Sequence, residues 1–167
     1  FILHAEHSIN ASAFAVRVVA STKADFYAAV TAGVSALKGP LHGGAAESVM
    51  KMALEIGSEE NAEQYVNDLL ESGEVLMGFG HPVYRTVDPR SIHLKNEAKA
   101  LAIRKGDPKW FSILSAITQT KRVKELADKG VHPNVDFWAG VSYFLLDIPE
   151  DLFVSVFAIG RIPGWVA

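Results

Sequence analysis

The stretch GPLHGGAAESVMKMALEIG, residues 39–57, decides the fold class of this 167-residue chain. Its opening Gly-Pro pair ends one helix, because proline cannot continue a helix. Apolar residues at helical spacing then predict a second helix over residues 43–56, and the glycine at position 57 ends it. The stretch therefore predicts two helices separated by a short break, and the break carries a histidine, His42.

Residues that begin or end helices recur in both directions along the chain. Asp25 and Asp107 are placed to cap helices, and Gly106 to end one. The helices predicted in this way cover residues 4–20, 25–38, 43–56, 58–73, 91–105, 107–129, 135–146 and 150–163. A Gly/Pro-rich segment near residues 75–84 is irregular or strand-like. Helices with almost no strand predict an all-α fold.

Composition bounds the function classes. Hydrophobic residues make up 49% of the chain, which is enough for a substantial core, and the net charge of -3 gives no basic field for nucleic acid or an anionic membrane. We therefore expect neither partner, and no apolar run reaches the roughly 18 residues of a membrane span. The absence of cysteine fits a reducing compartment, so cytoplasm is the expected location. Because both ends fall in apolar helical patterns, we expect a piece of a longer chain.

Three candidate catalytic residues lie in the breaks between helices: His42 in GPLHGG, His81 in GFGHPVY and Asp136 in PNVDFWAG. Loops held by rigid helices are where functional groups are usually mounted. Any one histidine at a helix end is more often a cap than a catalytic group. The GFGH segment adds weight, because its two glycines let backbone N–H groups approach a ligand.

Two arginines are candidates for binding an anion. Arg161 lies in an otherwise apolar segment, FVSVFAIGRIPGW, and Arg90 follows Asp-Pro. A buried guanidinium needs an anionic or hydrogen-bonding partner, so Arg161 is either part of a structural ion pair or a clamp on a substrate carboxylate. The residue pattern alone leaves both interpretations open.

A metal site has one weak signal in the sequence. His4 and His7 fall three residues apart within the first predicted helix, which would place both on one face. No cysteine, HExxH motif or carboxylate cluster accompanies them. We therefore expect no metal site, and a metal hydrolase is a remote third hypothesis.

Five motifs taken in order, LHAEHSINAS, GPLHGGAAE, MGFGHPVYRTVDPR, HPNVDFWAG and FAIGRIPGW, closely resemble those of the citrate synthase family. The resemblance implies an all-α fold with a large and a small domain, a homodimer, and an active site between the domains. By the match, residues 1–41 and 148–167 resemble large-domain helices and residues 42–147 the small domain. The family's N-terminal helices and last C-terminal stretch have no counterpart in this sequence.

The resemblance also implies roles for individual residues. Asp136 resembles the base that removes a methyl proton from acetyl-CoA, and His42 the donor to the thioester oxygen. His81 resembles the histidine that polarises the oxaloacetate carbonyl. The remaining implied site residues are the oxaloacetate ligands His7, Arg90 and Arg161, and the coenzyme A-binding residues Gly78, Phe79, Gly80 and Asn134. No permanently bound cofactor is implied, since coenzyme A enters as the thioester co-substrate.

Physical chemistry supports the pairing of a carboxylate base, Asp136, with an imidazole donor, His42. A carboxylate with an ordinary pKa near 3.9 is a weak base toward a carbon acid, so the enolate must be stabilised as the proton leaves. A neutral imidazole can do this by donating a hydrogen bond, and a helix N-terminus near His42 disfavours the imidazolium, as one does in triosephosphate isomerase. We therefore expect His42 to be neutral.

Several alternatives stay open at this point. The proline after His81 leans toward 2-methylcitrate synthase, which uses propionyl-CoA, although an extra methylene changes binding by only about 1–3 kcal/mol. A second class of hypothesis is an idle helical module that keeps the motifs without the activity. Because the family completes its site with a C-terminal arginine of the partner subunit, we expect these 167 residues alone to have little or no synthase activity.

Overall fold

The computed structural model describes residues 1–39 and 42–167. These residues form α-helices joined by short 3-10 helices and loops, and their only β-type pairing is a single bridge between Phe79 and Pro133. The predicted all-α fold is confirmed. The chain divides into two compact units, residues 1–45 with 151–167 and residues 46–150.

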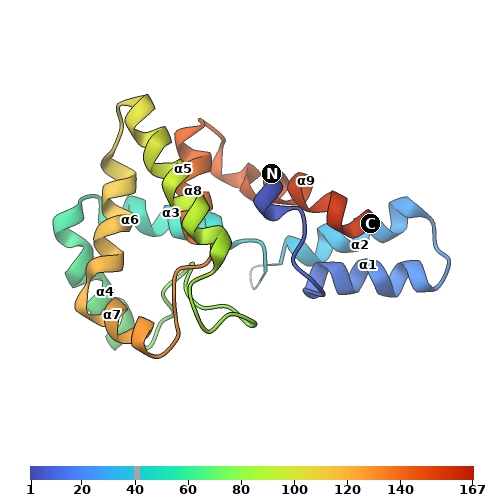
Figure 1. Cartoon of the computed structure of the whole chain (residues 1–167), viewed down its shortest axis with the longest axis horizontal. Helices are drawn as coiled ribbons and strands as arrows, with labels where there is room; N and C mark the ends of the chain where they lie inside the picture. Colours follow the sequence, from blue (N-terminus) through green and yellow to red (C-terminus); the bar gives the residue numbers. More distant parts are fainter. Residues whose placement is uncertain (40–41) are drawn as a thin grey trace. The chain divides into compact units, whose positions relative to one another are not determined.

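The first unit is a helical hairpin with a third helix packed against it (Figure 1). Its elements are η1 (Ile2–His4), α1 (Ala11–Ser21), α2 (Phe26–Leu37) and α9 (Phe153–Val166). The predicted cap at Asp25 is confirmed, because its carboxylate accepts the backbone N–H of Ala28 at 3.0 Å.

The core of the first unit lies where α1, α2 and α9 meet. Its larger buried side chains are Val16, Leu37, Phe157 and Trp165. The segment before α1 packs closely on α9, since a Cβ placed on Gly164 would overlap the carbonyl oxygen of Ala5. The chain that carries His7 is therefore held against α9 by backbone contact.

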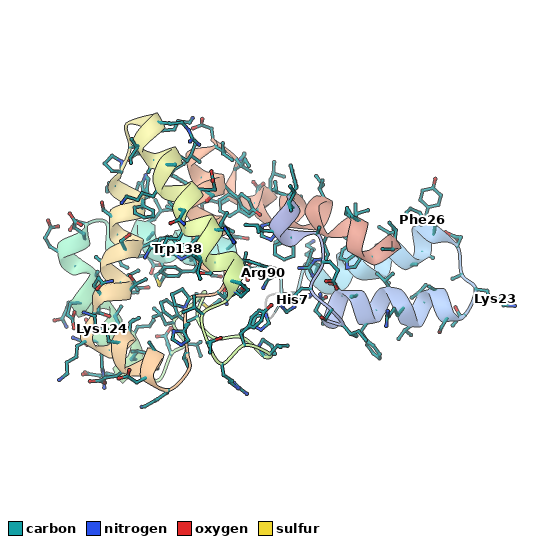
Figure 2. The ribbon with its side chains drawn as sticks, in the orientation of Figure 1. His7, Lys23, Phe26, Arg90, Lys124 and Trp138 are labelled. Atoms are coloured by element: carbon teal, nitrogen blue, oxygen red, sulfur yellow. The ribbon has the colours of Figure 1, made fainter. Side chains whose placement is uncertain are left out.

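The second unit contains the remaining helices. They are α3 (Ala45–Ile56), η2 (Glu59–Asn61), α4 (Ala62–Glu71), α5 (Pro89–Lys105), α6 (Lys109–Gln119), α7 (Lys121–Asp128) and α8 (Val135–Leu145), followed by η3 (Glu150–Leu152), which crosses into the first unit. Figure 2 shows Trp138 of α8 among the side chains of this unit. It is 1% exposed, and its ring centroid lies 5.0 Å from that of Phe137 and 5.4 Å from that of Phe111.

Helix α8 is central to the second unit because nearly all of its residues are buried. It packs against α5 and passes close to α3. A Cβ on Gly140 would lie 2.5 Å from the carbonyl oxygen of Ala46, so only glycine permits this approach. Packing of this kind fixes the first turn of α8, which contains Asp136.

The prediction of a continuous helix over residues 4–20 is wrong. Only residues 2–4 form a 3-10 turn, and α1 begins at Ala11, where the side chain of Asn10 accepts the backbone N–H of Ala13 at 3.0 Å. Ser8 has φ of 49°, a left-handed conformation that interrupts a helix. His4 and His7 therefore do not share a helix face, and the geometric basis for a metal site there is lost.

Three further helix predictions need correction. Asp107 does not cap α6, which begins at Lys109 with Pro108 at the N-cap position and no side-chain cap hydrogen bond. The single helix expected over residues 107–129 is two helices, because Thr120 has an extended backbone and its hydroxyl accepts the N–H of Val123 to begin α7. The last helix continues through Pro163 to Val166. The fixed φ of proline near about -65° is compatible with helix, but Pro163 has no N–H to donate to the preceding turn. Within the described residues, no helix is long and apolar enough to span a bilayer.

Candidate active site

The candidate residues divide between the two units. The first unit holds His7, His42 and Arg161, and the second holds Gly78, Phe79, Gly80, His81, Arg90, Asn134 and Asp136. The environment of each group is described within its own unit.

The ring of His42 is fixed by one serine. The backbone N–H of Ser12 donates to His42 Nε2 at 3.3 Å, and the Ser12 hydroxyl oxygen lies 3.0 Å from the same nitrogen. A ring nitrogen that accepts an N–H carries a lone pair, so we assign the proton of the neutral ring to Nδ1. In this tautomer Nδ1–H is a donor.

The electrostatic environment of His42 favours the neutral ring. Burial lowers the pKa of His42 below its ordinary value, and the positive charge of Arg161 lowers the pKa further. The direction agrees with the neutral ring expected from the sequence. The causes are burial and a guanidinium, whereas the sequence interpretation relied on a helix dipole.

Arg161 is buried against an aromatic ring. Its side chain is 2% exposed, its Nε donates to the carbonyl oxygen of His4, and its guanidinium carbon lies 4.9 Å from the centroid of Phe157. The ring of His4 lies 4.4 Å from the same phenylalanine ring. These contacts fix the direction of the guanidinium within the first unit.

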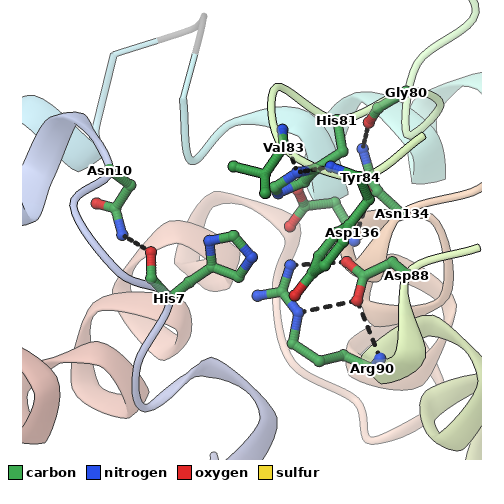
Figure 3. Close-up of polar contacts among 10 residues, drawn as sticks. All are labelled: His7, Asn10, Gly80, His81, Val83, Tyr84, Asp88, Arg90, Asn134 and Asp136. Atoms are coloured by element: carbon green, nitrogen blue, oxygen red, sulfur yellow. Dashed lines mark hydrogen bonds and ion pairs between the residues drawn. The ribbon is translucent and has the colours of Figure 1, made fainter. Parts of the chain in front are cut away.

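His7 lies in the irregular segment before α1. Its carbonyl oxygen accepts a hydrogen bond from the side-chain amide of Asn10 at 3.2 Å, as Figure 3 shows. The carboxylate of Glu6 accepts the backbone N–H of Ser8. Local hydrogen bonds on both sides of His7 therefore shape the backbone that carries its ring. Among the residues described by the structure, no three His, Asp or Glu side chains form a set suited to a metal ion.

The ring of His81 is oriented by its own loop (Figure 3). His81 Nδ1 accepts the backbone N–H of Val83 at 3.0 Å and that of Tyr84 at 3.3 Å. Two donors to one nitrogen exclude a proton there, so we assign the proton to Nε2. The ring of Tyr84 packs against the imidazole with a centroid distance of 4.7 Å.

Arg90 is held by Asp88, a residue that the sequence interpretation missed. Nε and Nη2 of Arg90 donate to the two carboxylate oxygens of Asp88 at 3.0 and 2.7 Å. The side chain of Asp88 is 1% exposed and that of Arg90 13%. Asp88 also caps α5 by accepting the backbone N–H of Arg90 at 2.9 Å.

The charge state of Asp88 follows from these contacts. Burial alone would raise the pKa of the Asp88 carboxyl, but hydrogen bonds from Arg90 and its positive charge outweigh burial, and the nearby His81 adds to them. The pKa therefore lies below its ordinary value. Asp88 stays charged at neutral pH and holds the Arg90 fork in one direction.

Two loops of the second unit are joined by backbone hydrogen bonds. Gly80 N–H donates to the carbonyl oxygen of His132 at 2.9 Å, and Asn134 N–H donates to that of Gly78 at 2.8 Å. The Asn134 side chain donates to the Gly80 carbonyl oxygen at 3.0 Å. Its other amide atom accepts the N–H of Asp136 at 3.0 Å and so begins α8. The GFG segment and Asp136 are therefore linked through one asparagine.

The segment 78–80 has little steric freedom. Gly78 has φ of 77° and Gly80 φ of 76°, both in the left-handed region that glycine favours. A Cβ on Gly78 would lie 2.7 Å from Val49 and 3.0 Å from Phe137. Phe79 packs edge-to-face on Phe137, with ring centroids 4.9 Å apart.

Comparison with known proteins decides the family. The family model described as citrate synthase, C-terminal domain, matches residues 1–167. The chain belongs to the citrate synthase family. The family suggested by the five sequence motifs is thus confirmed.

Relatives of known name agree with this assignment. The chain is 47% identical over 168 residues to citrate synthase 2 of Bacillus subtilis, covering 99% of the chain and 44% of that protein. It is 45% identical over 166 residues to 2-methylcitrate synthase 2 of Corynebacterium glutamicum, covering 99% and 42%. The chain therefore spans less than half the length of these citrate synthase family members.

A solved citrate synthase has the same fold. The enzyme from Thermoplasma acidophilum, solved as a ternary complex with carboxymethyl coenzyme A and oxaloacetate, matches with a TM-score of 0.91 at 37% identity. The match covers 98% of this chain and 44% of that citrate synthase.

Proposed function

We propose that the protein containing this chain is a citrate synthase, which condenses acetyl-CoA with oxaloacetate to give citrate and coenzyme A. The observation that carries the proposal is the pair of fixed imidazole tautomers. The contacts of Ser12 assign the proton of His42 to Nδ1, and the loop backbone assigns that of His81 to Nε2. Two imidazoles with assigned donor nitrogens suit a reaction that develops negative charge on two carbonyl oxygens.

In the proposed reaction, Asp136 removes a proton from the methyl group of acetyl-CoA while His42 donates a hydrogen bond to the thioester oxygen. The resulting enolate carbon attacks the ketone carbon of oxaloacetate, and His81 protonates the ketone oxygen as the carbon–carbon bond forms. Water then cleaves the citryl thioester, releasing citrate and the coenzyme A thiol. An aimed donor of the His42 type is worth about 2.7–4 kcal/mol of transition-state stabilisation.

Substrate binding completes the proposal. His7, Arg90 and Arg161 bind the carboxylates and carbonyl of oxaloacetate. Because Asp88 accepts from Nε and Nη2 of Arg90, the Nη1 side of this guanidinium is the part offered to the substrate. Residues 78–80 and Asn134 bind the coenzyme A thioester through backbone N–H groups and the amide. Residues 1–41 and 148–167 are assigned to the large domain and residues 42–147 to the small domain of a homodimer. Located in the cytoplasm, such an enzyme supplies the tricarboxylic acid cycle.

A second candidate substrate is propionyl-CoA, which would make the protein a 2-methylcitrate synthase. It is favoured by Pro82 after His81, and a 2-methylcitrate synthase of Corynebacterium glutamicum is among the relatives at 45% identity. The ratio of kcat/KM for propionyl-CoA to that for acetyl-CoA, measured on the protein containing this chain, distinguishes the two. A ratio above one would replace citrate with 2-methylcitrate as the product.

Release of thiol from acetyl-CoA in the presence of oxaloacetate tests the function itself. The His42→Ala variant is expected to lower kcat by about 10²–10³-fold. If the protein shows neither thiol release nor oxaloacetate binding by calorimetry, the idle helical module is the correct interpretation. We further propose that the 167 residues alone have little activity, and release of thiol by them at the rate of a full-length family member would contradict this.

A further inference from the structure

The loop that carries His81 is irregular and partly exposed. Residues 81–88 form neither helix nor strand. The side chains of Pro82, Val83 and Arg85 are exposed, whereas those of His81 and Tyr84 are half-buried. Contacts within the loop contribute to the orientation of the His81 ring.

Tyr84 makes two of these contacts. Its backbone N–H donates to His81 Nδ1 at 3.3 Å, and its ring packs on the imidazole at a centroid distance of 4.7 Å with a 36° angle between planes. The two backbone hydrogen bonds fix which nitrogen accepts. These hydrogen bonds form only at one rotation of the ring about its Cβ–Cγ bond, since any other rotation carries Nδ1 away from both donors. A packed aromatic face opposes rotation away from this orientation.

We propose that Tyr84 is a positioning residue whose ring holds the His81 imidazole in the orientation that keeps Nδ1 on the loop backbone and Nε2–H toward the substrate. The part that concerns the substrate rests on the proposed citrate synthase function. The tautomer and ring orientation do not depend on it. In this assignment Tyr84 acts through His81.

Nitrogen NMR of the histidine rings tests the inference without any need for activity. The protein containing this chain is labelled with ¹⁵N-histidine, and the His81 signals are identified by their loss in His81→Gln. The wild type and Tyr84→Phe are expected to give the pattern of a single Nε2–H tautomer, because both keep the aromatic face. Tyr84→Leu and Tyr84→Met are expected to shift both nitrogens toward the average of two tautomers.

Tyr65→Leu is the matched control. Tyr65 lies in the same unit, and its hydroxyl donates to Glu55 at 2.8 Å. The substitution removes a tyrosine ring without changing the His81 loop, so the His81 pattern is expected to stay that of the wild type. An unchanged single-tautomer pattern in both Tyr84→Leu and Tyr84→Met would overturn the inference.

Kinetics on the protein containing this chain gives a second measurement. Tyr84→Leu is expected to lower kcat by about two- to tenfold, the equivalent of one aromatic contact, and Tyr84→Phe to retain kcat. If Tyr84→Phe lowers kcat as much as Tyr84→Leu does, the hydroxyl of Tyr84 is the group that matters, and the proposed role of the ring is overturned. If the wild type has no synthase activity, the proposed function fails while the NMR result still decides the role of Tyr84.

Discussion

Ser12 and His42 are 30 residues apart in the chain, and the backbone N–H and hydroxyl of the serine both lie within 3.3 Å of one nitrogen of the histidine ring. Ser12 is 0% exposed, so water does not replace these contacts. The first turn of α1 therefore determines which edge of the His42 ring is available to a ligand.

Ser12→Ala removes the hydroxyl and keeps the backbone N–H. The hydroxyl also donates to Asn10 Oδ1 at 2.7 Å, so the substitution removes this hydrogen bond as well as the contact with His42 Nε2. In the protein containing this chain we expect kcat to fall by about two- to tenfold. Ser21→Ala is the control, since the Ser21 hydroxyl donates to the Val18 carbonyl oxygen on the same helix and is exposed. If both variants lose the same kcat, the cause is a general disturbance of α1 and the contact with His42 is not responsible.

His42 predicts how stability changes with pH. Above its ordinary pKa of 6.5 the ring is neutral in both folded and unfolded chains. Between 6.5 and the lower folded pKa only the unfolded chain binds the proton, so the free energy of unfolding falls as the pH falls. Urea unfolding of wild type and His42→Asn on both sides of pH 6.5 measures this, and the variant is expected to lose less stability on acidification. Equal losses would contradict the lowered pKa.

Asp88→Asn keeps an N-cap for α5 and removes the charge that holds Arg90. We expect a loss of about 1.5–3 kcal/mol in the free energy of unfolding, typical of hydrogen bonds to a charged group, and a higher KM for oxaloacetate. Asp88→Ala also removes the cap and is expected to lose about 1 kcal/mol more. Urea unfolding and initial-rate kinetics measure the two effects.

The same carboxylate predicts behaviour in acid. Because its folded pKa lies below the ordinary 3.8, Asp88 contributes stability above that pH and loses it as the pH falls through the folded pKa. Acid titration of unfolding stability below pH 3.8 is therefore expected to be shallower in Asp88→Asn. A variant that follows the wild-type curve would indicate that Arg90 does not stabilise the carboxylate.

Gly78→Ala tests the packing of the GFG segment. Gly78 and Gly73 have similar φ values of 77° and 82°, but a Cβ on Gly73 meets nothing within 4 Å. Gly73→Ala is thus expected to cost only the left-handed backbone penalty of about 1–2 kcal/mol. Gly78→Ala is expected to cost about 1–3 kcal/mol more, because the added atom overlaps Val49 and Phe137. Equal midpoints of urea unfolding for the two variants would show that residues 78–80 shift to accommodate the added methyl group without cost.

Local signals in the sequence predicted most helix boundaries. Asp25 caps α2 as expected, and Gly106 ends α5 with φ of 67°. The errors have local causes as well. Thr120 was overlooked as a cap because the apolar pattern runs through it, and the helix expected over residues 4–20 ignored the cap at Asn10.

Partners distant in sequence were harder to predict than the site residues themselves. Nothing in the sequence connects Ser12 with His42, or Arg161 with the carbonyl oxygen of His4, because these contacts arise only when separate segments pack. Asp88 is different. An aspartate before proline at a helix start is a readable N-cap signal, and its bond to Arg90 two residues later was within reach of the sequence.

The hydrogen bonds between residues 78–80 and residues 132–134 make the His81 loop and the start of α8 one mechanical part. A ligand that pushes on the glycines displaces Asn134 with them, and Asn134 carries the first turn that bears Asp136. The proposed proton acceptor and proton donor of this unit would then travel together. The same hydrogen bonds limit how far residues 78–80 and the first turn of α8 can move apart.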